Sequence, residues 1–177
     1  MRILLAALCG VFALPGCREG EAARPGDIAI QWQGEDRAGG AILSARATLC
    51  RETGLVELFA IRGDTGLALA LFPPDSVHPV AIDYRVFHAA TDPETRPGAN
   101  IAIRWLDEIT LEAYEGTGGW VRLDSSPSGV LSGALDAALR SVERPPPDTL
   151  RVTARFHAVP LDTAGPGCGS LHRRNRL

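Results

Sequence analysis

Strict alternation of apolar and polar residues is the strongest constraint on how this chain can fold. Ile28, Ile30 and Trp32 alternate with smaller or polar neighbours in the first such run. The pattern returns over residues 41–50, 80–86, 101–105 and 152–158. Successive side chains of a β-strand point to opposite faces of the sheet, so a period of two predicts strands with one buried face.

Turn-forming segments separate these runs. They read GEDRAGG, PPDSVHP, TDPETRPGA, EGTGG, SSPSG and ERPPPD. Many short strands at this spacing predict a single all-β domain, an antiparallel β-sandwich or barrel-like sheet of about nine strands. We expect this domain to cover residues 27–160, followed by a Pro/Gly-rich and basic tail at 161–177.

Residues 130–142, VLSGALDAALRSV, fit two patterns. Leu131, Leu135, Leu139 and Val142 lie near one face of a helix, and the content of alanine and leucine favours a helix locally. Alternation and Gly133 favour a strand, as does the all-β pattern around the segment. We therefore predict a strand.

Residues 108–124 are expected to form a hairpin whose loop is Glu115 to Gly119, because glycine permits a tight reversal. This register places Glu112 opposite Arg122 and separates the aliphatic pairs from the aromatic and charged pairs. Asp107, Glu108, Glu112 and Glu115 then belong to the outer surface of a sheet. A calcium site is the alternative, but the chain has no D-x-D-x-D-G loop.

The N-terminus has the order of features of an exported protein. Arg2 is followed by an apolar run from Ile3 to Ala13, which is too short for a permanent membrane span. Leu14-Pro15-Gly16-Cys17 resembles the lipobox of bacterial lipoproteins, with Pro15 in place of the usual small residue. The resemblance covers the first 17 residues and implies a signal peptide at 1–16 and lipidation of Cys17. Residues 17–26 then form the lipidated cysteine and a short tether.

The remaining cysteines predict one disulfide. Cys9 lies in the signal peptide, and Cys17 would carry the lipid, which leaves Cys50 and Cys168 as a pair. Disulfides persist in oxidising compartments outside the cytoplasm, so we expect a bridge between Cys50 and Cys168.

The stretch Leu58 to Phe72 contains two overlapping tripeptides. Arg62-Gly63-Asp64 is the integrin recognition sequence, and Asp64-Thr65-Gly66 is the catalytic sequence of aspartic proteases. An aspartic protease needs two carboxylates that share a proton. The runs on both sides indicate strands, so we interpret these residues as a β-turn between them. The second run, Leu67 to Phe72, is apolar on both faces and predicts a strand covered on both sides.

Other chemistry has little support in the sequence. All 18 basic residues are arginine, which excludes a lysine-dependent phosphate loop or Schiff base. The net charge of −3 gives no reason to expect nucleic acid. No serine lies in a G-x-S-x-G elbow. His78, Asp83 and His88 surround one predicted strand, but their parity does not favour a metal site. We expect no catalytic residue, cofactor or metal.

We therefore expect a lipid-anchored protein of the bacterial cell envelope that faces the periplasm. It contacts the membrane through the anchor at Cys17, and Arg18 after this cysteine favours the outer membrane. The domain would be a non-enzymatic binding or structural module. The alternative is an envelope hydrolase whose site assembles in space without a local motif. A hydrolase needs a pocket with convergent polar groups and shifted pKa values, whereas a binding module needs an exposed groove or apolar patch.

Overall fold

The computed structural model describes residues 24–74, 81–88, 96–107, 110–124, 129–143, 147–164 and Cys168. Nine strands run through these residues, which confirms the all-β fold class and the number of strands predicted. The strands are β1 (Asp27–Gly34), β2 (Ala38–Cys50), β3 (Val56–Arg62), β4 (Thr65–Phe72), β5 (Asp83–Val86), β6 (Gly98–Asp107), β7 (Thr110–Leu123), β8 (Val130–Ser141) and β9 (Thr149–Ala164). The described part of the chain contains no helix long and apolar enough to cross a lipid bilayer.

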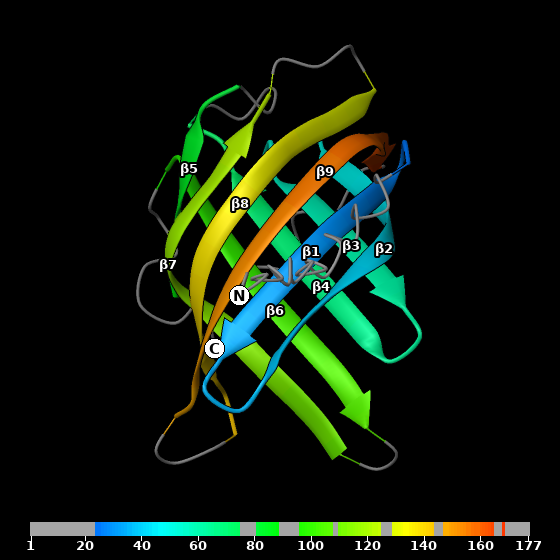
Figure 1. The fold of residues 1–177 in the computed structure, drawn as a ribbon. Coiled ribbons are helices and arrows are strands. Elements are labelled where there is room, and N and C mark those ends of the chain that lie inside the picture. Colours follow the sequence, from blue (N-terminus) through cyan, green and yellow to red (C-terminus); the bar gives the residue numbers. More distant parts are fainter. Residues whose placement is uncertain are drawn as a thin grey trace, which may run out of the picture.

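The strands form one sheet that closes on itself in the order β1-β2-β3-β4-β6-β5-β7-β8-β9. Closure comes from antiparallel pairing of β1 with both β2 and β9. Most neighbours are antiparallel, and two short parallel ladders join β5 to β6 and β2 to β9. Figure 1 shows β8, β9 and β1 in front, with β3, β4 and β6 crossing behind them. Of the two forms expected, the sheet is therefore barrel-like.

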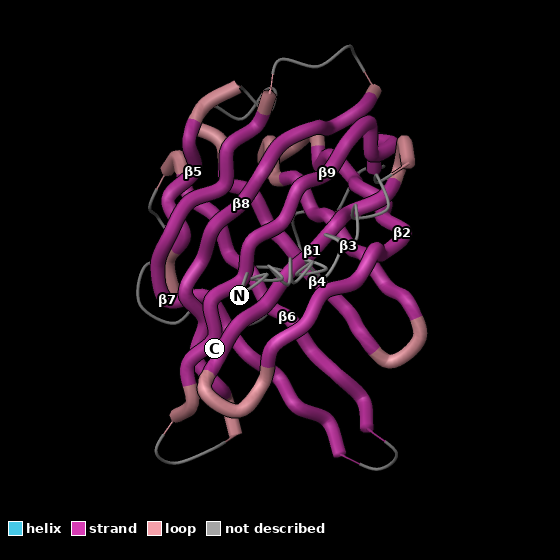
Figure 2. The backbone as a smooth tube through the Cα atoms, in the orientation of Figure 1, coloured by secondary structure: helices cyan, strands magenta, loops and turns pink. Residues whose placement is uncertain are grey.

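The interior of the barrel is filled by the apolar residues that the alternating pattern singled out. Ile28 and Ile30 of β1 are fully buried, as are Leu43 of β2 and Val152 of β9. A single cluster of buried side chains extends over all nine strands. Because strands make up most of the described backbone (Figure 2), the outward residues of these strands form most of its surface.

The stretch with two overlapping tripeptides is the tight turn between β3 and β4. Arg62 pairs with Thr65 across the turn, and Gly63 has a φ of +58°. The Thr65 hydroxyl donates a hydrogen bond to an Asp64 carboxylate oxygen at 3.0 Å. The prediction that these residues form a turn between two strands is confirmed.

The expected hairpin at residues 108–124 is wrong. Residues 110–123 form one continuous strand, β7, and Glu112 lies opposite Trp105 of β6 rather than opposite Arg122. Gly116 and Gly119 serve close approach instead of chain reversal. A Cβ atom on Gly119 would lie 2.2 Å from the Asp136 carbonyl oxygen of β8, and the ladder shifts register between Gly116 and Gly118. Glycine therefore marks a bulge here.

Residues 130–141 are strand β8, as predicted from their alternation. The buried side chains of Leu131, Leu135 and Leu139 point into the barrel. The strand pairs with β7 on one side and with β9 on the other. Pairing on both sides decides the structure of this segment despite its local preference for a helix.

The predicted disulfide between Cys50 and Cys168 is present, with the two Cα atoms 5.7 Å apart. β9 continues to Ala164, four residues beyond the boundary expected for the domain. Its last residues pair in parallel with Ala47 to Cys50 of β2. The disulfide thus joins Cys168 to the last residue of β2.

Candidate functional site

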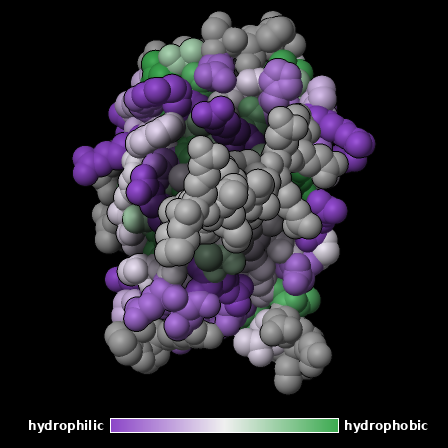
Figure 3. Space-filling view, in the orientation of Figure 1, coloured by the Kyte–Doolittle hydropathy of each residue, from purple (hydrophilic) through white to green (hydrophobic). Residues whose placement is uncertain are grey.

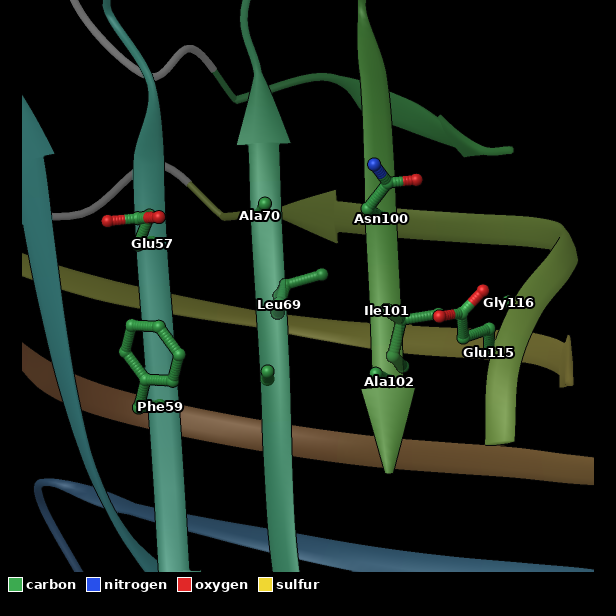
Figure 4. Close-up of a pocket in the computed structure, with 10 residues that line it drawn as sticks. Glu57, Phe59, Leu69, Ala70, Asn100, Ile101, Ala102, Glu115 and Gly116 are labelled. Atoms are coloured by element: carbon green, nitrogen blue, oxygen red, sulfur yellow. The ribbon is translucent and has the colours of Figure 1, made fainter. Parts of the chain in front are cut away.

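An apolar groove crosses the outer face of β3, β4 and β6. The register places Phe59 of β3 opposite Ala68 of β4, and Ala68 opposite Ala102 of β6. The next row joins Glu57, Ala70 and Asn100 in the same order. Figure 4 shows Phe59, Ala70 and Ala102 on three adjacent strands, with other strands crossing behind.

The groove has an aromatic wall and a floor of small residues. Phe59 is 53% exposed and Ile61 is 55% exposed, which is unusual for large apolar side chains in this domain. Ala68 of β4 and Ala102 of β6 lie between Phe59 of β3 and Gly116 of β7, and the hollow there has a volume of about 200 Å³. A contiguous exposed apolar surface of this kind marks a place where proteins or ligands bind.

Glu115 and Gly116 border the groove where β7 separates from β6. β6 pairs with β7 from Ala102 onward, but Gly98 and Ala99 pair with β5 instead. A Cβ atom on Gly116 would lie 2.5 Å from Ile101 and 2.8 Å from Val86, so a side chain there would force the three strands apart.

Asn100 lies on β6 just before this separation. Its Oδ1 atom is buried and accepts no hydrogen bond, which distinguishes it among the described side chains that are not exposed. Buried polar atoms are normally paired, so this carbonyl oxygen is an unused acceptor at the edge of the groove.

The groove corrects one sequence-based expectation. β4 was expected to be covered on both faces because Leu67 to Phe72 is apolar throughout. Leu67, Leu69 and Leu71 are buried in the barrel, whereas Ala68 and Ala70 point outward and are only half-buried. The outward apolar residues therefore form the floor of an open groove.

One end of the barrel is closed by aromatic side chains. The Trp32 and Trp105 rings have centroids 5.2 Å apart, and Trp105 and Tyr114 have centroids 5.8 Å apart. The Arg37 guanidinium lies 4.6 Å from the Trp105 ring centroid and forms an ion pair with Glu112. These contacts pack the three rings and the guanidinium against one another at this end of the barrel.

The acidic cluster is divided by the register of β6 and β7. Glu112 pairs with Arg37 at the barrel end, whereas Glu115 lies beside the groove, 3.6 Å from the His88 imidazole. Glu108 and the Asp107 side chain lie outside what is described. No group of three potential metal ligands occurs among the described residues.

Asp83 and His88 are also separated. Asp83 accepts two hydrogen bonds from Arg122, at 2.6 and 2.9 Å, and His88 contacts Glu115. His78 lies outside the described residues. A metal site built on these three residues was not favoured by their parity, and Asp83 is instead part of an exposed ion pair.

Two exposed ion pairs lower the pKa values of two aspartates on the outer surface of the sheet. The hydrogen bonds from Arg122 hold the pKa of Asp83 below its ordinary value, and Arg151 lowers the pKa of Asp136 in the same way. Each arginine binds its carboxylate through two nitrogen atoms, with distances of 2.6–2.9 Å. Such pairs orient side chains on a sheet surface and keep the carboxylates ionised.

The predicted site residues have separate places in the structure. Cys50 and Cys168 form the disulfide, and Cys17, the expected lipidation site, lies outside the described residues. Sequence reasoning did not single out Phe59, Ala68 or Asn100. The available signal was the outward parity of Phe59 and Ile61, which alternate with Leu58 and Ala60. It could not reveal the groove, because the groove depends on which strands are neighbours.

Comparison with known proteins identifies no relative. No family model matches the chain, no curated protein matches its sequence, and no solved structure matches its fold.

Proposed function

We propose that this chain is a lipid-anchored protein of the bacterial cell envelope. Its barrel would be a non-enzymatic binding module that contacts a partner through the apolar groove. The observation that carries the binding role is the exposed Phe59 beside a floor of alanines, with the exposed Ile61 two residues further along the same face of β3. An exposed aromatic side chain beside a preformed apolar hollow suits an anchor residue of a partner.

The anchor rests on the N-terminal sequence. Arg2, the apolar run and Leu14-Pro15-Gly16-Cys17 stand in the order that lipoprotein processing requires. The Cys50–Cys168 disulfide supports an oxidising compartment, as expected for a periplasm-facing domain. Arg18 favours the outer membrane. At least two acyl chains on Cys17 would provide stable attachment.

The groove favours binding over the hydrolase alternative. Its wall and floor are mostly apolar, with Glu57, Asn100 and Glu115 at the edges. Among the described residues, the acids whose pKa values are shifted, Asp83 and Asp136, lie in surface ion pairs away from it. A hydrolytic site needs such groups to converge around one reacting atom.

The anchor is tested by mass spectrometry of the N-terminal peptide from the membrane fraction. We expect an acylated Cys17 as the first residue, and Cys17→Ser should leave the protein unprocessed and without acyl chains. An unmodified N-terminus at another residue would contradict the anchor.

The groove is tested by photo-crosslinking in cells, with benzoylphenylalanine in place of Phe59. Val142 is the matched control position, because it is exposed to a similar degree but lies outside the groove. We expect a discrete adduct from position 59 that is absent from position 142. Ala68→Gln, which fills the floor, should abolish it. Equal labelling from both positions would count against the groove.

A further inference from the structure

The outer face of β7, β8, β9 and β1 carries an exposed tryptophan in a polar setting. Trp120 is 37% exposed and lies opposite Asp136 of β8. Asp136 lies opposite Thr153 of β9, which in turn lies opposite Gln31 of β1. One row of outward side chains, here called the Trp120 row, therefore crosses four adjacent strands. This face lies toward the viewer in Figure 3, where hydrophilic side chains gather around the β1–β2 turn.

Two open depressions meet at this row. One has a volume of about 690 Å³ and extends from Trp120 and Asp136 past Gly118 toward Gln33. The other has a volume of about 370 Å³ and extends along Gln31 and Thr153. Small outward residues, including Ala134 and Ala138, leave the face hollow on both sides of the tryptophan. Together the depressions form an elongated groove with Trp120 at its middle.

The charged groups that line this groove are balanced, since Glu35 and Asp136 are acidic and Arg151 and Arg155 are basic. Arg151 donates two hydrogen bonds to Asp136 at 2.6 and 2.9 Å, and Arg122 pairs in the same way with Asp83. The Arg122 guanidinium also lies 5.2 Å from the Trp120 ring centroid. These contacts fix the polar side chains before any ligand arrives, which lowers the entropic cost of binding. Because acidic and basic groups are equal in number along the groove, it has no strong field of one sign.

An exposed tryptophan within an elongated groove of polar groups indicates a particular class of ligand. A rigid aromatic ring offers an apolar surface, and the amide, hydroxyl and paired ionic groups around it offer donors and acceptors at fixed positions. A β-linked pyranose ring has the complementary surface, since its C–H bonds form flat apolar faces and its hydroxyl groups project around the edge. A nucleic acid would instead need an excess of cations along the groove.

We propose that the Trp120 row binds an uncharged, β-1,4-linked glycan chain. One pyranose ring lies against Trp120, and neighbouring rings occupy the two depressions. Asp136, Arg151 and Gln31 hydrogen-bond to hydroxyl or acetamido groups. This site is on a different face from the apolar groove of β3, β4 and β6 and does not depend on that groove having a partner.

The test is isothermal titration of the full chain with chitotetraose and cellotetraose, which differ in their acetamido groups. We expect saturable binding of at least one, accompanied by a change in tryptophan fluorescence that Trp120→Phe removes. Trp120→Ala should weaken binding by at least about tenfold, as for an aromatic anchor at the centre of a site. Asp136→Asn combined with Arg151→Gln should also weaken it.

Val142→Ala is the control, because it removes an exposed apolar side chain that lines neither depression and should leave the affinity unchanged. Thermal unfolding of each variant shows whether the fold persists, and Trp120→Phe keeps the test valid if Trp120→Ala unfolds. Absence of saturable binding up to millimolar tetramer would overturn the proposal. So would equal affinity of the wild type, Trp120→Ala and Trp120→Phe, or stronger binding of an oligogalacturonate than of both neutral tetramers.

Discussion

Replacing Gly119 by alanine tests the structural reason for the glycines in β7. Gly119 has a φ of +118°, and a Cβ atom there would lie 2.2 Å from the Asp136 carbonyl oxygen and 2.7 Å from the Ala137 Cα atom. Both neighbours are backbone atoms of β8 and cannot rotate away. β7 and β8 would have to separate locally, and the alanine would also occupy an unfavourable backbone conformation.

The cost follows from these two contributions. Backbone strain and overpacking each contribute about 1–3 kcal/mol, so Gly119→Ala should reduce the free energy of unfolding by about 2–6 kcal/mol. With a slope of about 4 kcal/mol/M in guanidinium chloride, the unfolding midpoint should fall by roughly 0.5–1.5 M. A domain of ordinary stability, about 5–15 kcal/mol, could lose a large share of it.

Gly118→Ala is the control, because no heavy atom lies within 4 Å of the added methyl group. Its effect should stay within about 0.5 kcal/mol, as for most surface substitutions. The assay is equilibrium unfolding of both variants, followed by circular dichroism under non-reducing conditions. Equal midpoints for the two variants would refute the close approach of β7 to β8 and favour the loop expected from the sequence.

Two further predictions concern the disulfide and the surface ion pairs. Cys50→Ala combined with Cys168→Ala opens a loop with a sequence separation of 118. It should cost up to about 4–5 kcal/mol in guanidinium unfolding, and unchanged stability would show that the bridge adds nothing. Because the folded state lowers the pKa of Asp83 and Asp136, their stabilisation is present above the ordinary carboxylate pKa and disappears as the pH falls through the lowered values. The variant that combines Asp83→Asn with Asp136→Asn should therefore lose less unfolding free energy than the wild type between about pH 5 and pH 2. Parallel profiles of unfolding free energy against pH would contradict this.

The strands could be predicted because burial on one face imposes a period of two on the sequence. The alternation alone predicts which face of a strand is buried, without knowledge of its partner strands. Examples are Ile28 and Ile30 of β1 and Val152 and Ala154 of β9. The same reasoning resolved β8, where alternation outweighed the local preference of alanine and leucine for a helix. It also identified the turn at Gly63, where the chain reverses between two clear strands.

The failure in β7 has a physical cause. A glycine-rich segment is required both where a chain reverses and where two backbones approach closely, and the local sequence does not distinguish the two cases. Gly116 accommodates side chains of β5 and β6, and Gly119 accommodates the backbone of β8. These neighbours come from distant parts of the chain.

The two candidate binding surfaces could not be predicted from the sequence for a related reason. Phe59, Ala68 and Asn100 come together through strand order, as do Gln31, Asp136 and Trp120 on the other face. Sequence alternation shows that each residue points outward. It does not show which other outward residues lie beside it.

The pairing of β1 with β9 sets an order of events for folding. Asp27 at the start of the domain lies opposite His157, so the first strand lacks one of its neighbours until almost the whole chain is available. Contacts between such distant segments slow folding, because a long loop must close before they form. A nascent chain emerging from the ribosome or a membrane pore therefore cannot complete this fold from its N-terminus. The barrel cannot close before β9 has been made. If the chain is exported through a channel that admits only unfolded polypeptides, this delay keeps it unfolded enough to pass through.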